Sequence, residues 1–511
     1  MSTESKFPRS SGILMHPTSL PGPYGVGDLG PEAYRFVDFL QSAGQKLWQV
    51  LPLNPTGYAD SPFQALSAYA GNPLLLSLDR LVDAGVLTKN DIHATPMFPE
   101  ETVDYGAAIA FKMPLLRKAA ENFATSASES DRKKFDEFKR SNSTWLDDFA
   151  LFMAVKEAND LVQWTLWPAD MAARKPEAIK QWSARLSREI EAHKYWQYEF
   201  FQQWQALREY AHQRGIRIIG DVPIYVSHDS SDVWANRQFF CLRPDGEPEK
   251  MSGVPPDYFS ATGQLWGNPI YNWPLLKETG YKWWVDRIRA ALRLYDYLRL
   301  DHFRGFEAYW EVPGGSTTAI NGQWVKGPGA ALFEVLQREL GDLPIIAENL
   351  GVITPEVESI RHRFQMPGMA ILQFGFGTDP QAPTFRPHNY VRELVAYTGT
   401  HDNDTVMGWW NSGAGAGSTR TPQDVEREHA YARSYLHFKD EPVNWVLIRG
   451  IHASVANTAI APLQDVLGLG NEGRMNLPGT KSGNWKWRVR PGALTGEHAS
   501  RLLESVKLYE R

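Results

Sequence analysis

Short apolar runs that end in polar or glycine residues alternate along the chain with stretches of helical periodicity. The apolar runs, which we expect to be strands, cover residues 12–16, 47–53, 216–222, 297–303, 343–349, 370–376 and 394–402. Helices are expected between them at 31–44, 196–214, 279–294, 328–340 and 355–364. Strands that alternate with helices predict βαβ units and a parallel sheet. The number of units favours an α/β chain with a closed (β/α)8 TIM barrel over an open sheet.

Two stretches interrupt this alternation. Residues from about 80 to 195 are charged and helical, and we expect them to form an inserted helical subdomain between early strands. Residues 227–278 are rich in proline, glycine and aromatic side chains, which predicts a loop-rich insertion without regular elements. Long loops of this kind are usually functional or disordered, and the aromatic residues favour function. The chain 1–511 is therefore expected to be a single catalytic barrel with two insertions.

Four of the expected strands end in segments that carry an acid: Asp221, Asp301, Glu348 and Asp402. In (β/α)8 barrels the catalytic residues lie at these carboxyl ends. Arg299 precedes Asp301 by two residues, so both side chains point to the same face of a strand, and the cation favours the ionised carboxylate. The pair fits a nucleophile, and a structural ion pair is the alternative.

Glu348 follows an apolar run and precedes a turn. Such surroundings raise the pKa of a carboxyl group toward the value that a general acid needs. The alternative is a glutamate in a βα loop without a catalytic role. Cleavage or transfer of a glycosidic bond needs one protonated and one ionised carboxyl group, which this sequence offers.

The segment "THDNDT" places His401, Asp402 and Asp404 together after an apolar run. A calcium-binding loop is excluded, because Met407 and Gly413 occupy the positions where that motif needs glycine and glutamate. A polar turn and a group that binds hydroxyls remain as alternatives.

Composition narrows the possible partners. The formal net charge of −6 gives no electrostatic reason to expect nucleic acid or an anionic membrane. The single cysteine, Cys241, excludes an internal disulfide and suits a reducing cytoplasm. No stretch approaches the roughly 18 to 20 apolar residues that span a bilayer, and no secretory signal is recognisable. A cytoplasmic location is expected.

Aromatic residues make up 12% of the chain and include 19 tryptophans. Flat apolar rings with polar edges are what a sugar-binding cleft needs. The glycine-rich stretch 413–418 lacks the lysine of a phosphate-binding loop and does not follow a good strand. Neither a metal nor a cofactor is expected.

Several motifs resemble those of the amylomaltases, or 4-α-glucanotransferases, a branch of the α-amylase superfamily. They span positions 12 to 480 and read "GILMHPTSLPGPYGVGDLG", "QVLPLNPTGYADSPFQ", "SAYAGNP", "GDVPIYV", "GVPPDYFSATGQLWGNPIYNW", "RLDHFRGFEAYW", "IIAENLG", "GTHDNDT" and "RMNLPGT". The resemblance implies transfer of an α-1,4-glucan segment to the 4-hydroxyl of glucose or a maltooligosaccharide, by a retaining double displacement through a covalent glycosyl-enzyme. A monomer or weak homo-oligomer is expected.

The resemblance also implies roles for individual residues. Asp301 would be the nucleophile, Glu348 the general acid and base, and Asp402 the stabiliser of the transition state. The residues expected to bind substrate are Tyr58, Ser61, Asp221, Tyr258, Gln264, Trp266, Arg299, His302, His401 and Asn476. The chain departs from the family pattern at three positions near the first of these: Asn54 and Ala59 stand where glycine is common, and Phe63 where tyrosine is common.

Overall fold

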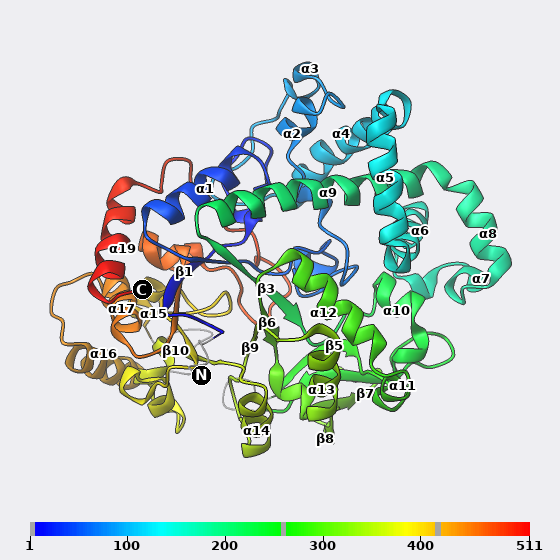
Figure 1. Ribbon diagram of the computed structural model, residues 1–511. Helices are drawn as coiled ribbons and strands as arrows, with labels where there is room; N and C mark the ends of the chain where they lie inside the picture. Colours follow the sequence, from blue (N-terminus) through cyan, green and yellow to red (C-terminus); the bar gives the residue numbers. More distant parts are fainter. Residues whose placement is uncertain (1–5, 257–261, 414–420) are drawn as a thin grey trace.

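A computed structural model of the chain describes residues 6–256, 262–413 and 421–511 (Figure 1). Within these residues, eight parallel strands form the central sheet in the spatial order β10-β11-β12-β1-β2-β3-β6-β9. Their bounds are Ser10–Leu14 (β1), Leu47–Gln49 (β2), Arg217–Pro223 (β3), Tyr297–Asp301 (β6), Ile345–Ala347 (β9), Gly368–Ile371 (β10), Leu394–Tyr397 (β11) and Thr458–Pro462 (β12). The Ala347 N–H donates to the Pro367 carbonyl at 2.9 Å and links β9 to the start of β10. The predicted (β/α)8 barrel is confirmed.

The barrel strands are buried on both faces, as expected for a parallel sheet that helices surround. Every residue of β1, β2, β9, β10 and β12 is buried. Four surrounding helices lie close to their predicted bounds: Pro31–Ser42 (α1), Lys282–Leu294 (α12), Ala330–Leu340 (α13) and Pro355–Arg363 (α14). The helix predicted at 196–214 begins earlier, as Ser187–Gln213 (α9). Proline stands at the first turn of α14, where its missing N–H costs nothing.

Several details of the strand prediction were wrong. The strands expected at 47–53 and 394–402 already end at Gln49 and Tyr397. The strand β12 was not anticipated, because its five residues include two alanines and no large alternating pattern. The expected strand 370–376 ends at Ile371 and continues as the 3-10 helix Leu372–Phe376, since a continuous apolar run does not distinguish buried strand from buried helix.

The segment between β2 and β3 holds a series of helices, coloured from blue through cyan to green in the upper part of Figure 1. After α2 (Leu78–Asp83) and α3 (Lys89–Ile92) these are Tyr105–Ser126 (α4), Glu129–Ser141 (α5), Ser143–Ala158 (α6), Ala169–Ala172 (α7), Pro176–Arg185 (α8) and α9. The helical character of the segment agrees with the sequence. The subdomain bounds of about 80 to 195 stay a prediction.

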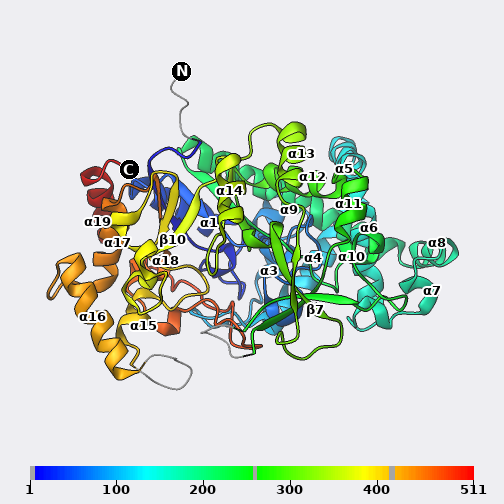
Figure 2. The same ribbon diagram turned by 90° about the horizontal axis from the view of Figure 1, so that it is seen from below.

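The stretch 227–278 contains regular elements, so the expectation of none was wrong. It holds α10 (Ser231–Ala235), β4 (Lys250–Val254), β5 (Gln264–Pro269) and α11 (Trp273–Glu278). β4 pairs antiparallel with β5 and with β7 (Ala308–Pro313), and β7 pairs with β8 (Gln323–Lys326). Figure 2 shows β7 between the barrel on the left and helices α6 to α8 on the right. The β4–β7 pair joins segments that lie on either side of β6 in sequence, so no local pattern indicates it.

One further property follows from helix length and composition. In the described part of the chain, no helix combines the length and the apolar character needed to cross a membrane.

Candidate active site

The carboxyl end of β6 carries Arg299 and Asp301 on the same face of the strand. Nη2 of Arg299 lies 2.8 Å from Oδ1 of Asp301. Nη1 donates to both carboxylate oxygens of Asp221 on the neighbouring strand β3, at 2.8 and 2.7 Å. Burial lowers the pKa of Arg299, but Asp221 and Asp301 raise it by more, so this pKa lies well above its usual value. One buried cation therefore holds two strand-end carboxylates.

Glu348 follows β9 directly, and its side chain is buried. Its Oε2 accepts the His302 N–H at 2.7 Å, and its Oε1 accepts the Leu350 N–H at 2.8 Å. Burial, reinforced by the charge of Asp301, raises the pKa of Glu348 to about 7. The carboxyl group is thus held in place by backbone and can carry a proton near neutral pH.

His302 occupies the left-handed conformation, with φ of 51°, between β6 and the 3-10 helix Phe303–Phe306. This turn directs its backbone N–H to Glu348. The imidazole meets the Trp266 ring edge to face, with ring centroids 4.8 Å apart. Burial lowers the pKa of His302 to about 4, although Asp301 raises it, so the ring is neutral at neutral pH.

Asp402 lies in the turn after β11, and its side chain is 45% exposed. Its Oδ1 accepts from Nδ2 of Asn476 at 2.7 Å and lies 3.4 Å from Nε2 of His401. Arg474 stabilises this turn by two hydrogen bonds. Its Nη2 donates to the Asp402 carbonyl at 2.8 Å, and its Nε donates to the Asn476 carbonyl at 2.7 Å. The third guanidinium nitrogen of Arg474, Nη1, pairs with Asp404.

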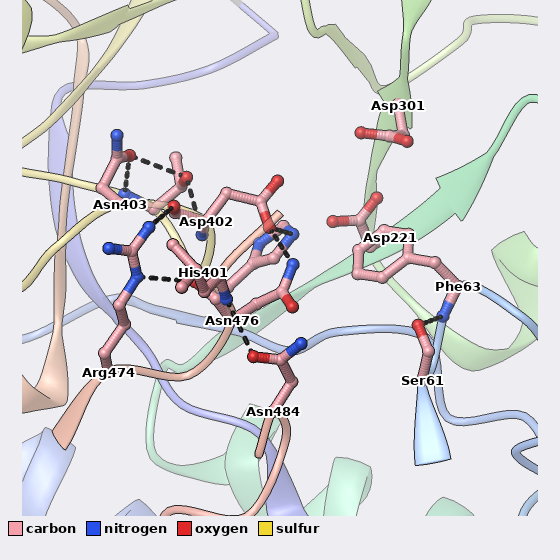
Figure 3. A network of polar contacts seen from close by, with 12 residues as sticks. Ser61, Phe63, Asp221, Asp301, His401, Asp402, Asn403, Arg474, Asn476 and Asn484 are labelled. Carbon is pink, nitrogen blue, oxygen red and sulfur yellow. Dashed lines mark hydrogen bonds and ion pairs between the residues drawn. The ribbon is translucent and has the colours of Figure 1, made fainter. Parts of the chain in front are cut away.

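Figure 3 shows Asp221 and Asp301 together with the turn that carries Asp402. Asp301 and Asp221 lie on one side, and Asp402 lies on the other with its carboxylate directed toward them. The pKa of Asp221 also reflects this proximity. Burial raises it, and the charges of Asp301 and Asp402 raise it further, whereas Arg299 lowers it. The structure brings the predicted strand-end acids to one end of the barrel.

Aromatic rings surround His401. The Phe63 ring stacks on the imidazole with centroids 4.9 Å apart and planes 18° apart, and the Trp485 ring lies 5.8 Å from both. Burial lowers the pKa of His401, so the stacked imidazole is neutral at neutral pH.

The remaining predicted substrate-binding residues have different surroundings. Gln264 and Trp266 lie on β5, and Nε1 of Trp266 donates to Oε1 of Gln264 at 3.3 Å. Oγ of Ser61 accepts the N–H of Phe63 at 3.2 Å. Tyr58 begins the 3-10 helix Tyr58–Asp60, and Tyr258 lies outside the described residues.

Two residues of the site were not predicted from the sequence. Arg474 holds the Asp402 turn, and Trp485 closes the ring cluster around His401. Arg474 opens the motif "RMNLPGT", but nothing in the sequence says that it reaches a turn 72 residues earlier. Across residues 6–256, 262–413 and 421–511, no group of three or more His, Cys, Asp or Glu side chains is arranged to hold a metal ion.

Comparisons with known proteins assign the family. A family profile described as 4-alpha-glucanotransferase matches residues 15–495. The 4-alpha-glucanotransferase of Synechocystis is 50% identical over 98% of this chain and 98% of that protein, and that of Thermus thermophilus is 48% identical over 99% and 100%. The structure of an amylomaltase from Streptococcus agalactiae in complex with acarbose superposes with a TM-score of 0.93 at 42% identity, over 98% of this chain and 99% of that one. On this evidence the chain belongs to the 4-alpha-glucanotransferase family.

Proposed function

We propose that this 4-alpha-glucanotransferase works by a retaining double displacement on α-1,4-glucans, with glucose or a maltooligosaccharide as acceptor. The observation that carries the proposal is the pair formed by Asp301, held by Arg299, and Glu348, whose buried carboxyl group has a pKa of about 7. A retaining enzyme needs one ionised carboxylate and one carboxyl group that can give and take a proton.

In the first step an oxygen of Asp301 attacks the anomeric carbon while Glu348 gives its proton to the leaving glycosidic oxygen. A covalent glycosyl-enzyme forms, and the shortened glucan leaves with a new hydroxyl group. In the second step Glu348, now a carboxylate, takes the proton of the acceptor 4-hydroxyl, whose oxygen displaces Asp301. We expect the two carboxyl groups to lie about 5–5.5 Å apart during catalysis.

Asp402 is the third acid of the proposal. Its carboxylate, fixed by Asn476, would bind sugar hydroxyls and stabilise the positive charge that develops at the anomeric carbon. The neutral imidazoles of His302 and His401 each have one N–H to donate to a sugar oxygen. Asp221 would act through Arg299, because it holds the guanidinium group that pairs with Asp301.

Transfer requires that a sugar acceptor reach the covalent intermediate faster than water does. We propose that Tyr258, Trp266 and Gln264 supply contacts for the acceptor and help to exclude water. Tyr58 and Ser61 are proposed to contact the glucan further from the reacting bond. For Trp266, the support is its position against His302.

Incubation of the pure protein with maltotriose tests the reaction. The transferase yields glucose together with oligomers longer than the substrate. A mixture without any oligomer longer than maltotriose would contradict transfer and indicate a hydrolase that shares the same carboxyl groups.

The covalent step has a separate test. We expect the variant Glu348→Gln, incubated with α-maltosyl fluoride, to accumulate protein whose mass is increased by one maltosyl unit. Fluoride leaves without acid assistance, whereas the second step lacks its base. The matched variant Asp301→Asn/Glu348→Gln should show no adduct, and an adduct on that double variant would contradict the assignment of the nucleophile.

A further inference from the structure

His16 is a buried histidine that the proposed mechanism does not use. It follows β1, and its carbonyl accepts the Ser19 N–H at 2.9 Å at the start of the 3-10 helix Pro17–Ser19. The preceding residue, Met15, is tied to β2, because its N–H donates to the Gln49 carbonyl at 2.9 Å. These bonds hold His16 at the same end of the barrel as the three proposed catalytic acids.

His16 and His401 line one cavity under the Asp402 turn. The other polar residues of its wall include Asn403, Asp404, Gln464 and Arg474. They come from the segments that follow β1, β11 and β12, which are adjacent strands of the barrel. The cavity therefore lies behind the side of the site that holds Asp402.

The His16 imidazole is only 5% exposed, and its Nδ1 has no hydrogen-bond partner among the described protein atoms. A buried polar atom of this kind needs an explanation, because leaving it unpaired costs free energy. Burial, together with the nearby His401, lowers the pKa of His16 to about 3. His16 is thus neutral beside His401, which is neutral as well.

A neutral imidazole has one nitrogen that donates and one that accepts, and the partner of one nitrogen decides the role of the other. His401 must present an N–H from Nε2, because that atom faces Oδ1 of Asp402 at 3.4 Å. Its Nδ1 then has to be an acceptor. A hydrogen-bond acceptor placed beside Nδ1 would instead favour the tautomer that carries the proton on Nδ1.

We propose that His16 is a positioning residue that acts through His401. The polar cavity that they share has room for a water molecule, which would bond Nδ1 of the neutral His16 ring and donate to Nδ1 of His401, so that Nε2–H of His401 is directed at Asp402 and the sugar. Phe63 stacks on the His401 ring, Trp485 lies beside it, and His16 lines the cavity that His401 also lines. The inference rests on the proposed roles of Asp402 and His401.

The test replaces His16 with leucine, which removes both ring nitrogens, and measures kcat and KM on maltotriose. Residues that orient a metal ligand from outside typically contribute 10- to 100-fold, and by analogy we expect a loss of about tenfold in kcat with KM within about twofold. His16→Asn restores an acceptor or donor near the position of Nδ1 and should recover most of the loss. His16→Gln places that group near Nε2 and should recover less.

A matched control is His452→Leu. His452 is equally buried, at 2% exposure, and is likewise neutral, since burial lowers its pKa to about 3, but its Nδ1 is paired with Oγ of Ser505 at 2.8 Å. We expect this variant to lose thermal stability and to keep its kcat. If His16→Leu loses kcat only as far as His452→Leu does, the role of His16 is structural and the proposal is wrong.

A second readout is independent of turnover. In ¹⁵N-histidine-labelled protein, the two ring nitrogens of His401 report its tautomer, and His16→Leu should shift that equilibrium whereas His452→Leu should not. Unchanged His401 signals would overturn the proposal even if kcat falls. Failure of the underlying mechanism is distinguishable, because Asp402→Asn would then keep the wild-type kcat.

Discussion

On one side of the active site, Arg299 on β6 contacts both Asp301 of the same strand and Asp221 on the paired strand β3, whereas on the other side Asp402 stands in a turn and is held by Asn476. We call the first group, with Glu348, the strand side, and Asp402 with His401, Asn476 and Arg474 the turn side. The strand-side residues lie on, or directly after, barrel strands that are hydrogen-bonded to one another. The turn side is joined by side chains from segments more than 70 residues apart in sequence.

Exposure separates the buried ion pair of the strand side from the acid of the turn side. The side chains of Arg299 and Asp221 are 5% and 0% exposed, whereas that of Asp402 is 45% exposed. A charge removed from water depends on its partner far more than a charge that water can still solvate. We therefore expect the strand-side residues to contribute to both stability and catalysis, and the turn-side residues to be replaceable at small cost in the free energy of unfolding. The following predictions test this difference.

The largest effect is expected at the proposed nucleophile. Asp301→Asn removes the attacking carboxylate, and kcat on maltotriose should fall by about 10⁴-fold or more, as for nucleophile loss in other covalent enzymes. Its amide oxygen can still accept from Arg299, so the fold should persist. The measurement is the initial rate of glucose release. Asp286→Asn, which removes an exposed carboxylate of α12, is the control and should keep full activity.

Arg299→Leu tests the strand side as a unit. It leaves Asp221 buried without its cation, and removal of one partner of a buried ion pair typically costs 3–5 kcal/mol of the free energy of unfolding. Thermal and denaturant unfolding should show a loss of about this size, together with loss of activity. Arg363→Leu breaks an exposed pair with Glu334 and should cost less than about 1 kcal/mol. Equal losses in both variants would contradict the distinction between buried and exposed pairs.

The pH dependence of kcat/KM should follow the protonation of Glu348. Its pKa is raised from 4.5 to about 7 by burial, so the proton needed for the first step is lost above neutral pH. We expect kcat/KM to fall about tenfold per pH unit on the alkaline side of pH 7 to 8. A profile that stays flat to pH 9 would contradict Glu348 as the general acid.

The stability of the folded protein should also depend on the protonation of Glu348. Between pH 4.5 and about 7 the folded protein keeps a proton on Glu348 that the unfolded chain has lost, so the contribution of Glu348 to stability falls as pH rises through this window. The melting temperature of the wild-type protein should therefore decline between pH 5 and pH 8 relative to that of Glu348→Gln, which cannot titrate at this position. Parallel curves for the two proteins would show that Glu348 does not titrate in this range.

The strand side could largely be predicted from the sequence, and the turn side only in part. An apolar run that ends in an acid marks a strand end, and the spacing of Arg299 and Asp301 predicted their contact, which the structure confirms. The contact of Arg299 with Asp221 spans 78 residues, and the brace from Arg474 to the Asp402 carbonyl spans 72. No local pattern encodes such pairs. The central pairing of the second sheet, β4 with β7, was missed for the same reason, because it crosses β6.

The smallest effect is expected on the turn side, from Asn476→Ala. Asn476 donates one hydrogen bond to a half-exposed carboxylate, so the free energy of unfolding should change by less than about 1 kcal/mol. The carboxylate loses its orientation, however, and a hydrogen bond to a charged group is worth about 1.5–3 kcal/mol, which corresponds to roughly 10- to 100-fold in kcat. Asn476→Asp is the matched variant: it keeps the size but places a second negative charge beside Asp402, and it should be slower than the alanine variant. If Asn476→Ala instead destabilised the protein as much as Arg299→Leu, the turn side would be part of the folding core, and the separation of stability from catalysis would fail.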